Sequence, residues 1–153
     1  MTENTSSIRC LTLFVADYVA VERGKLYVSG GYWNHLRVRS FPTALNLGVG
    51  AVFEIPWHDN SQHQFVISFE SEDGKAVGGT LTGVFKTGTP PDAREGDPNL
   101  LPIAANLNGL VIPEQGDYSV IVSIDGNKID RWGFRVTQTL SVPGMPKIPG
   151  SGQ

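Results

Sequence analysis

The residues of this chain best suited to chemistry lie between positions 57 and 63, in the stretch "WHDNSQH". His58, Asp59 and His63 supply two imidazoles and a carboxylate, which are ligands that a mononuclear metal site can use. The stretch has the composition of a turn, and no regular backbone aligns the two histidines, so we interpret them as solvated polar side chains. A metal-dependent enzyme at this loop stays an alternative, and no metal or other cofactor is expected.

Motifs that align a nucleophile or cradle a phosphate are missing from the sequence. It contains no GxSxG, no HExxH and no GxxxxGK[ST]. Cys10 is the only cysteine, which excludes an intrachain disulfide, and its position at the head of an apolar run predicts a small buried side chain. We therefore expect a protein that is not an enzyme.

The aromatic residues indicate a binding role more directly. Trp57 follows a proline in the same loop, while Tyr32 and Trp33 are adjacent, so that they point to opposite faces of an extended chain. Tryptophan and tyrosine combine a large apolar area with a polar group, which suits a sugar platform or a partner anchor. A carbohydrate-binding module that uses Trp57 with Tyr32 or Trp33 is a second alternative, whereas Trp132 is expected in the core.

The charge pattern argues against a nucleic-acid partner. Lys and Arg number 12 against 15 Asp and Glu, for a net charge of −3, and the basic residues are scattered. The start of the chain has no basic segment before its apolar run, and that run is too short to span a membrane. A cytoplasmic protein without membrane or nucleic-acid partners is expected.

The elements that must position these residues are extended. Short runs of Val, Ile, Thr, Phe and Tyr recur between turns of Gly, Pro, Asp and Asn, and no run has the spacing of an amphipathic helix. The predicted strands are 10–22, 25–38, 45–55, 63–70, 76–86, 103–112, 117–124 and 128–138. Their alternating apolar faces must be covered by a second layer, which predicts a β-sandwich.

The clearest predicted hairpin is 117–138, which turns at "DGN". Its bulky residues share one parity, with Tyr118 and Val120 in the first arm and Trp132 and Phe134 in the second. Only an odd-numbered loop brings them onto one face, so we expect a three-residue loop with a bulge and the pairs Val120–Trp132 and Tyr118–Phe134. The opposite face, which includes Ile121, is expected to be mostly exposed to solvent.

The order of several short motifs resembles a group of small uncharacterised bacterial proteins. These motifs are "VADYVAVERGKLYVSGGYWNHL", "EDGK" and "IPEQGDYSVIVSIDGNKID", and the resemblance covers residues 10–138. It implies a compact β-sandwich of bacterial origin. It implies no activity, so no site residue follows from it.

The sequence thus predicts a single all-β domain, an antiparallel β-sandwich of about eight strands with Greek-key or jelly-roll connections, over residues 8–140. Residues 1–7 are expected to be flexible, and the prolines and glycines of 141–153 predict a frayed tail. The function we expect is that of a non-catalytic binding or assembly module, either a homo-oligomer or a protein that binds another. An edge strand or the loop 87–102 would be its contact surface.

Overall fold

A computed structural model describes residues 7–140, and these contain no helix that is long and apolar enough to cross a membrane. The expectations for the terminal segments 1–7 and 141–153 lie outside the described residues, except at Ser7. Nine strands make up the described part of the chain. They are β1 (Arg9–Glu22), β2 (Lys25–Gly31), β3 (His35–Val38), β4 (Thr43–Ile55), β5 (Gln62–Ser71), β6 (Leu81–Lys86), β7 (Asn99–Ile112), β8 (Gly116–Ile124) and β9 (Asn127–Gln138).

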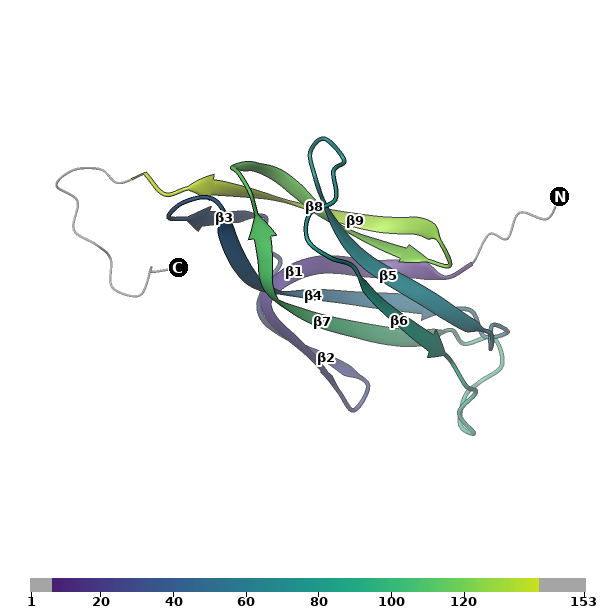
Figure 1. The fold of residues 1–153 in the computed structure, drawn as a ribbon. Coiled ribbons are helices and arrows are strands. Elements are labelled where there is room, and N and C mark those ends of the chain that lie inside the picture. The colour runs from purple at the N-terminus through teal and green to yellow at the C-terminus, as the bar shows by residue number, and fades with distance from the viewer. Residues whose placement is uncertain (1–6, 141–153) are drawn as a thin grey trace.

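The strands form two layers (Figure 1). One sheet has four strands in the order β2-β1-β4-β7, and all of its neighbours are antiparallel. The other has five strands in the order β3-β9-β8-β5-β6 and is mixed, because β3 runs parallel to β9. The predicted all-β sandwich is confirmed, and the parallel pair is the exception to its antiparallel pairing.

The predicted strand 25–38 is wrong, because its two halves lie in different sheets. β2 ends at Gly31 in the first sheet and β3 begins at His35 in the second. The backbone takes left-handed angles at Gly30 (φ 59°) and Tyr32 (φ 63°), which interrupt the extended conformation and redirect the chain. This break accounts for the ninth strand.

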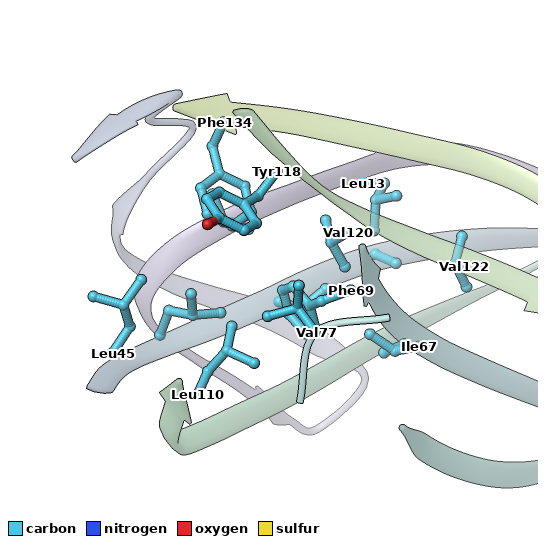
Figure 2. Close-up of a cluster of buried hydrophobic side chains, with 14 of the residues drawn as sticks. Leu13, Leu45, Ile67, Phe69, Val77, Leu110, Tyr118, Val120, Val122 and Phe134 are labelled. Atoms are coloured by element: carbon cyan, nitrogen blue, oxygen red, sulfur yellow. The ribbon is translucent and has the colours of Figure 1, made fainter. Parts of the chain in front are cut away.

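The core lies between the two sheets and follows the period of two along each strand. In β4, Val49, Ala51 and Phe53 are fully buried. Figure 2 shows the stacked rings of Tyr118 and Phe134 facing the same interior as side chains from the other sheet. The buried members of this cluster on β8 and β9 are Tyr118, Val120, Val122, Ile124, Phe134 and Val136.

The β8–β9 hairpin has the predicted core register but reaches it by another route. Tyr118 pairs with Phe134 and Val120 with Trp132, as expected. The three-residue loop is wrong: Asp125 (φ 50°) and Gly126 (φ 85°) form a two-residue turn between Ile124 and Asn127, which is the geometry of a type I′ hairpin. An extra residue, Ile129, lies between the partners of Val122 and Ser123. This bulge restores the parity of the bulky residues.

The outer face of this hairpin is less exposed to solvent than predicted. Ile121 is buried, with 3% of its surface exposed, although it lies on the face opposite Val120. It lines a shallow outer pocket with Glu70, Lys128 and Arg131. Long charged side chains cover apolar surface with their methylene groups, so parity alone did not decide the burial of Ile121.

β1 leaves its neighbour β4 halfway along its length. The two strands pair from Arg9↔Glu54 as far as Ala16↔Gly48, after which β1 pairs only with β2, and this hairpin extends from the main body (Figure 1). Asn106 of β7 reaches across β4 and holds the backbone of Val19 with two hydrogen bonds, at 2.7 and 3.1 Å. The departure leaves the first residues of β4, 43–47, without a neighbour on that side.

Candidate binding site

The structure brings together two of the three weak metal candidates, with a third group that sequence reasoning missed. The Nε2 atom of His63 lies 2.8 Å from an oxygen of Asp59, and its Nδ1 atom lies 2.6 Å from an oxygen of Asp125. Asp59 comes from the β4–β5 loop and Asp125 from the turn of the β8–β9 hairpin. His58 is exposed and has no place in this triplet. Only the tertiary fold brings Asp125 here, 62 residues from His63.

The triplet favours the charged form of the imidazole. Burial of the ring lowers the pKa of His63, but its hydrogen bonds to Asp125 and Asp59 outweigh burial and raise the pKa above its usual value. In the charged form both ring nitrogens donate to carboxylates, and neither then has a lone pair for a metal or a substrate proton. Within residues 7–140 no group of three His, Cys, Asp or Glu side chains is arranged to hold a metal ion.

Cys10 is half-buried and packs against the core, close to the expectation of a small buried side chain. Its thiol donates to the carbonyl oxygen of Thr12 at 3.1 Å. Burial, and next the carboxylate of Asp130, raises the pKa of the thiol to about 12. The group is therefore a neutral thiol at physiological pH, and a neutral thiol is a poor nucleophile.

The three aromatic candidates do not share one surface. Tyr32 N donates to Val15 O, and Val15 pairs with Val49. β4 ends at Ile55, six residues after Val49, and six residues of a strand span about 20 Å. Trp57 lies beyond that end. Trp57 is half-buried and has no ring contact in the described part of the chain. A platform that combines Trp57 with Tyr32 or Trp33 is not formed.

Tyr32 and Trp33 help to close one side of the sandwich. The Tyr32 ring stacks on Phe14 of the first sheet, with centroids 4.4 Å apart, and meets Trp132 of the second sheet edge-on at 5.5 Å. The indole N–H of Trp132 donates to Trp33 O at 3.1 Å. Although Tyr32 is 56% exposed, one face of its ring is thus covered.

Trp33 also lines a slot between β3 and the start of β4. The β3–β4 slot, as we call it, has a volume of about 530 Å³, within the range of about 300–1,000 Å³ that is usual for ligand sites. Arg39 and Ser40 begin the turn that joins β3 to β4 and closes one end of the slot, and Asp17 and Trp33 lie at the other. Its full lining is Asp17, Trp33, Leu36, Arg37, Val38, Arg39, Ser40, Thr43, Ala44, Leu45 and Asn46.

The two long walls of the slot are free strand edges. β3 is the last strand of its sheet and pairs only with β9 in the described part of the chain. Arg135 N donates to Asn34 O, and Thr139 N donates to Val38 O. Since successive residues of a strand alternate in direction, the even positions of β3 bond to β9, and the amide and carbonyl of Arg37 face the open edge. The opposite wall is the segment of β4 that β1 leaves unpaired.

Several polar groups around the slot lack partners. The indole Nε1 of Trp33 is buried and has no hydrogen-bond acceptor within residues 7–140, which is uncommon for a buried donor in a native protein. The guanidinium groups of Arg37 and Arg39 form no ion pair in the same range, in contrast to Arg9, which lies 3.1 Å from Glu54. The slot therefore combines an apolar interior with one buried donor that lacks an acceptor and two exposed arginines that lack an ion-pair partner.

Sequence reasoning selected Trp33 but missed the residues beside it. The signal that could have found them is the alternation in "HLRVRS", residues 35–40, where basic and apolar residues take turns. It indicated a strand with one charged face. The strand is the last of its sheet and faces the unpaired start of β4 in the other sheet. Both facts depend on contacts among residues distant in the sequence.

Comparison with known proteins adds a family but no activity. Residues 11–137 match the model of a family described as a family of unknown function (DUF6941), and no curated protein matches the chain. Among solved structures, a part of the Pseudomonas fluorescens alkylpurine DNA glycosylase AlkC bound to DNA containing an abasic site analog is similar to this chain, with a TM-score of 0.49 and 11% identity. The match covers 86% of this chain but only 31% of that one, and a likeness this distant says nothing about function.

Proposed function

Because the chain belongs to DUF6941, a family of unknown function, we propose from its geometry that it is a non-catalytic binding module. Its partner contributes an extended segment that enters the β3–β4 slot and pairs with β3 as a further strand. The observation that carries this proposal is the open edge of β3 along a cavity of about 530 Å³. Strand addition of this kind obtains affinity from main-chain hydrogen bonds and specificity from pockets for alternate side chains.

The unpartnered groups of the slot support a peptide as the ligand. A peptide strand beside β3 offers a carbonyl oxygen to the amide of Arg37 and an amide to its carbonyl. A further carbonyl of the same segment is an acceptor of the kind that the buried Nε1 of Trp33 lacks. Buried donors gain most from such a partner, because an unsatisfied donor retains its full cost of desolvation.

The reactive groups of the chain support a non-catalytic role. The nitrogens of His63 are both engaged with carboxylates, and the Cys10 thiol is protonated at neutral pH. Neither group lines the β3–β4 slot. A bound segment in the slot would therefore meet donors, apolar side chains and the carboxylate of Asp17, but neither of these two reactive groups.

A proline substitution at the open edge tests the proposal. Peptides selected from a display library of random ten-residue sequences are titrated against the wild type, Arg37→Ala and Arg37→Pro by fluorescence anisotropy. Both variants lose the guanidinium, but only proline also removes the amide hydrogen. We expect Arg37→Pro to bind at least about tenfold more weakly than Arg37→Ala, which corresponds to one main-chain hydrogen bond.

Amide hydrogen exchange of the wild type gives a second readout that needs no variant. The Arg37 amide should exchange more slowly once a selected peptide is bound, while the Leu36 amide, which faces β9, should keep its rate. Equal binding by Arg37→Ala and Arg37→Pro, an unchanged Arg37 exchange rate, or the absence of any enriched peptide would each overturn the proposal.

A further inference from the structure

The side chains of β3 are sorted by chemistry onto its two faces. Leu36 is half-buried and Val38 is buried, and both face the interior of the sandwich. His35 and Arg37, which alternate with them, are exposed on the outer face, and Arg39, just after the end of β3, is exposed as well. β3 therefore presents a basic row outside and an apolar row inside, along the same open edge.

The basic row is not neutralised by its surroundings. Its neighbour Arg135 on β9 is paired with Asp117 at 2.8 Å, and His35 Nε2 lies 2.8 Å from Thr137 Oγ1. Arg37 and Arg39, however, form no ion pair among residues 7–140. Two neighbouring positive charges, one on the edge strand and one just after its end, are therefore available to a partner from outside the chain.

The inner row faces the apolar part of the slot. Trp33 and Leu45 line it together with Leu36 and Val38. The one acidic residue of the lining, Asp17, lies at the end of the slot beside Trp33. It disfavours a carboxylate there by repulsion between like charges. An acidic side chain of a bound segment is thus attracted on the outer face and repelled at this end of the slot.

We infer that the segment held along β3 alternates acidic and apolar residues, with its carboxylates on the outer face opposite Arg37 and Arg39. This inference rests on the proposed function, since it requires a strand beside β3. Side chains of paired strands that share a face lie about 4.5–5.5 Å apart at their Cβ atoms, within the reach of arginine. The planar guanidinium also matches the two oxygens of a carboxylate. The intervening apolar residues then enter the slot.

Matched synthetic peptides test this assignment. Fluorescein-labelled GEVEVEVG and GKVKVKVG have the same apolar residues and differ only in the sign of their charged ones. We expect the acidic peptide to bind the wild type at least tenfold more tightly than the basic one. The preference should reverse in the double variant Arg37→Glu/Arg39→Glu, and the affinity of the acidic peptide should fall as NaCl is raised from 50 to 500 mM.

The control is the double variant Arg23→Glu/Arg94→Glu, which changes the net charge equally at two exposed positions outside the slot. It should keep the preference of the wild type. Equal affinity for the two peptides, or an equal response to both double variants, would overturn the acidic assignment. If peptides still bind and Arg37→Pro still weakens them more than Arg37→Ala, the proposed function survives that result. If proline and alanine act alike, strand addition itself is wrong.

Discussion

At the scale of single residues, His63 shows how the fold changes the meaning of a side chain. It was selected as a weak metal ligand, but its place between Asp59 and Asp125 makes it the cation of a small ion cluster. The hydrogen bond to His63 holds the pKa of Asp125 below its usual value. Burial raises the pKa of Asp59, but the hydrogen bond to His63 outweighs burial, and the pKa of Asp59 is lowered as well. The cluster joins the β4–β5 loop to the tip of the β8–β9 hairpin.

The direction of these pKa shifts predicts a pH window for stability. Since the pKa of His63 is raised in the folded state, its contribution is complete below the unfolded value of about 6.5 and is lost as pH rises through the folded value. The two aspartates contribute above their ordinary value of 3.8, and this contribution is lost as pH falls through their lowered values. The cluster is fully formed between these limits, near pH 5.

We expect His63→Gln to lower the free energy of unfolding at pH 5 by about 1.5–3 kcal/mol, the range for hydrogen bonds to charged groups. The loss should be smaller at pH 8.5, and urea titrations at the two pH values measure both. His35→Gln is the matched control. His35 is exposed, and its ring is hydrogen-bonded to the hydroxyl of Thr137 rather than to a carboxylate. A His63→Gln loss that is the same at both pH values would contradict the charged cluster.

At the scale of elements, β3 matters most because it is both short and terminal. Its four residues pair with the end of β9. The backbone N–H and C=O groups of its even-numbered residues bond to β9, and those of its odd-numbered residues face the open edge. Neighbouring positions therefore differ in what a substitution removes. A proline at an open edge position is tolerated, whereas one that faces a neighbouring strand removes a ladder hydrogen bond.

This alternation gives a prediction about stability that does not depend on any partner. We expect Leu36→Pro to cost about 3 kcal/mol or more in unfolding free energy, by analogy with other interior proline positions, and Arg37→Pro to cost less than about 1 kcal/mol. Urea unfolding of the two variants beside Leu36→Ala separates the backbone effect from lost packing. Similar losses for the two proline variants would show that the amide of Arg37 is bonded within the fold.

At the scale of the whole molecule, Trp132 joins the two layers at their open side. It packs against both hydrophobic clusters, meets Tyr32 edge-on and donates its indole N–H to the carbonyl of Trp33. The ring thus holds the β2–β3 connection, which passes from one sheet to the other. This connection also carries Trp33 at one end of the β3–β4 slot.

We expect Trp132→Ala to lower the free energy of unfolding by about 3 kcal/mol, the lower end of the range for a buried tryptophan because the ring is partly exposed. Trp132→Phe should lose about 1 kcal/mol, since it keeps most of the packing but not the hydrogen bond to Trp33. Trp57→Ala serves as the comparison and should cost less than Trp132→Ala. Equal losses for the two alanine variants in urea titrations would contradict the joining role of Trp132.

The sequence by itself determined the class of fold and most of its strands. Alternation of apolar and polar residues is a local property, and it predicted the pairs Tyr118–Phe134 and Val120–Trp132. It did not show how the hairpin reaches that register, because a two-residue turn with a bulge at Ile129 and a three-residue loop place the same side chains on the same face.

Only the tertiary structure decided the parts that bear on function. The break of 25–38 into two strands depends on left-handed backbone angles at Gly30 and Tyr32, and glycine and tyrosine also occur inside ordinary strands. Asp125 joined His63, and β3 came to face the unpaired start of β4, through contacts between residues far apart in the chain. Periodicity records which face a side chain takes, whereas the neighbour beyond that face is set by how the strands are ordered and where they stop pairing.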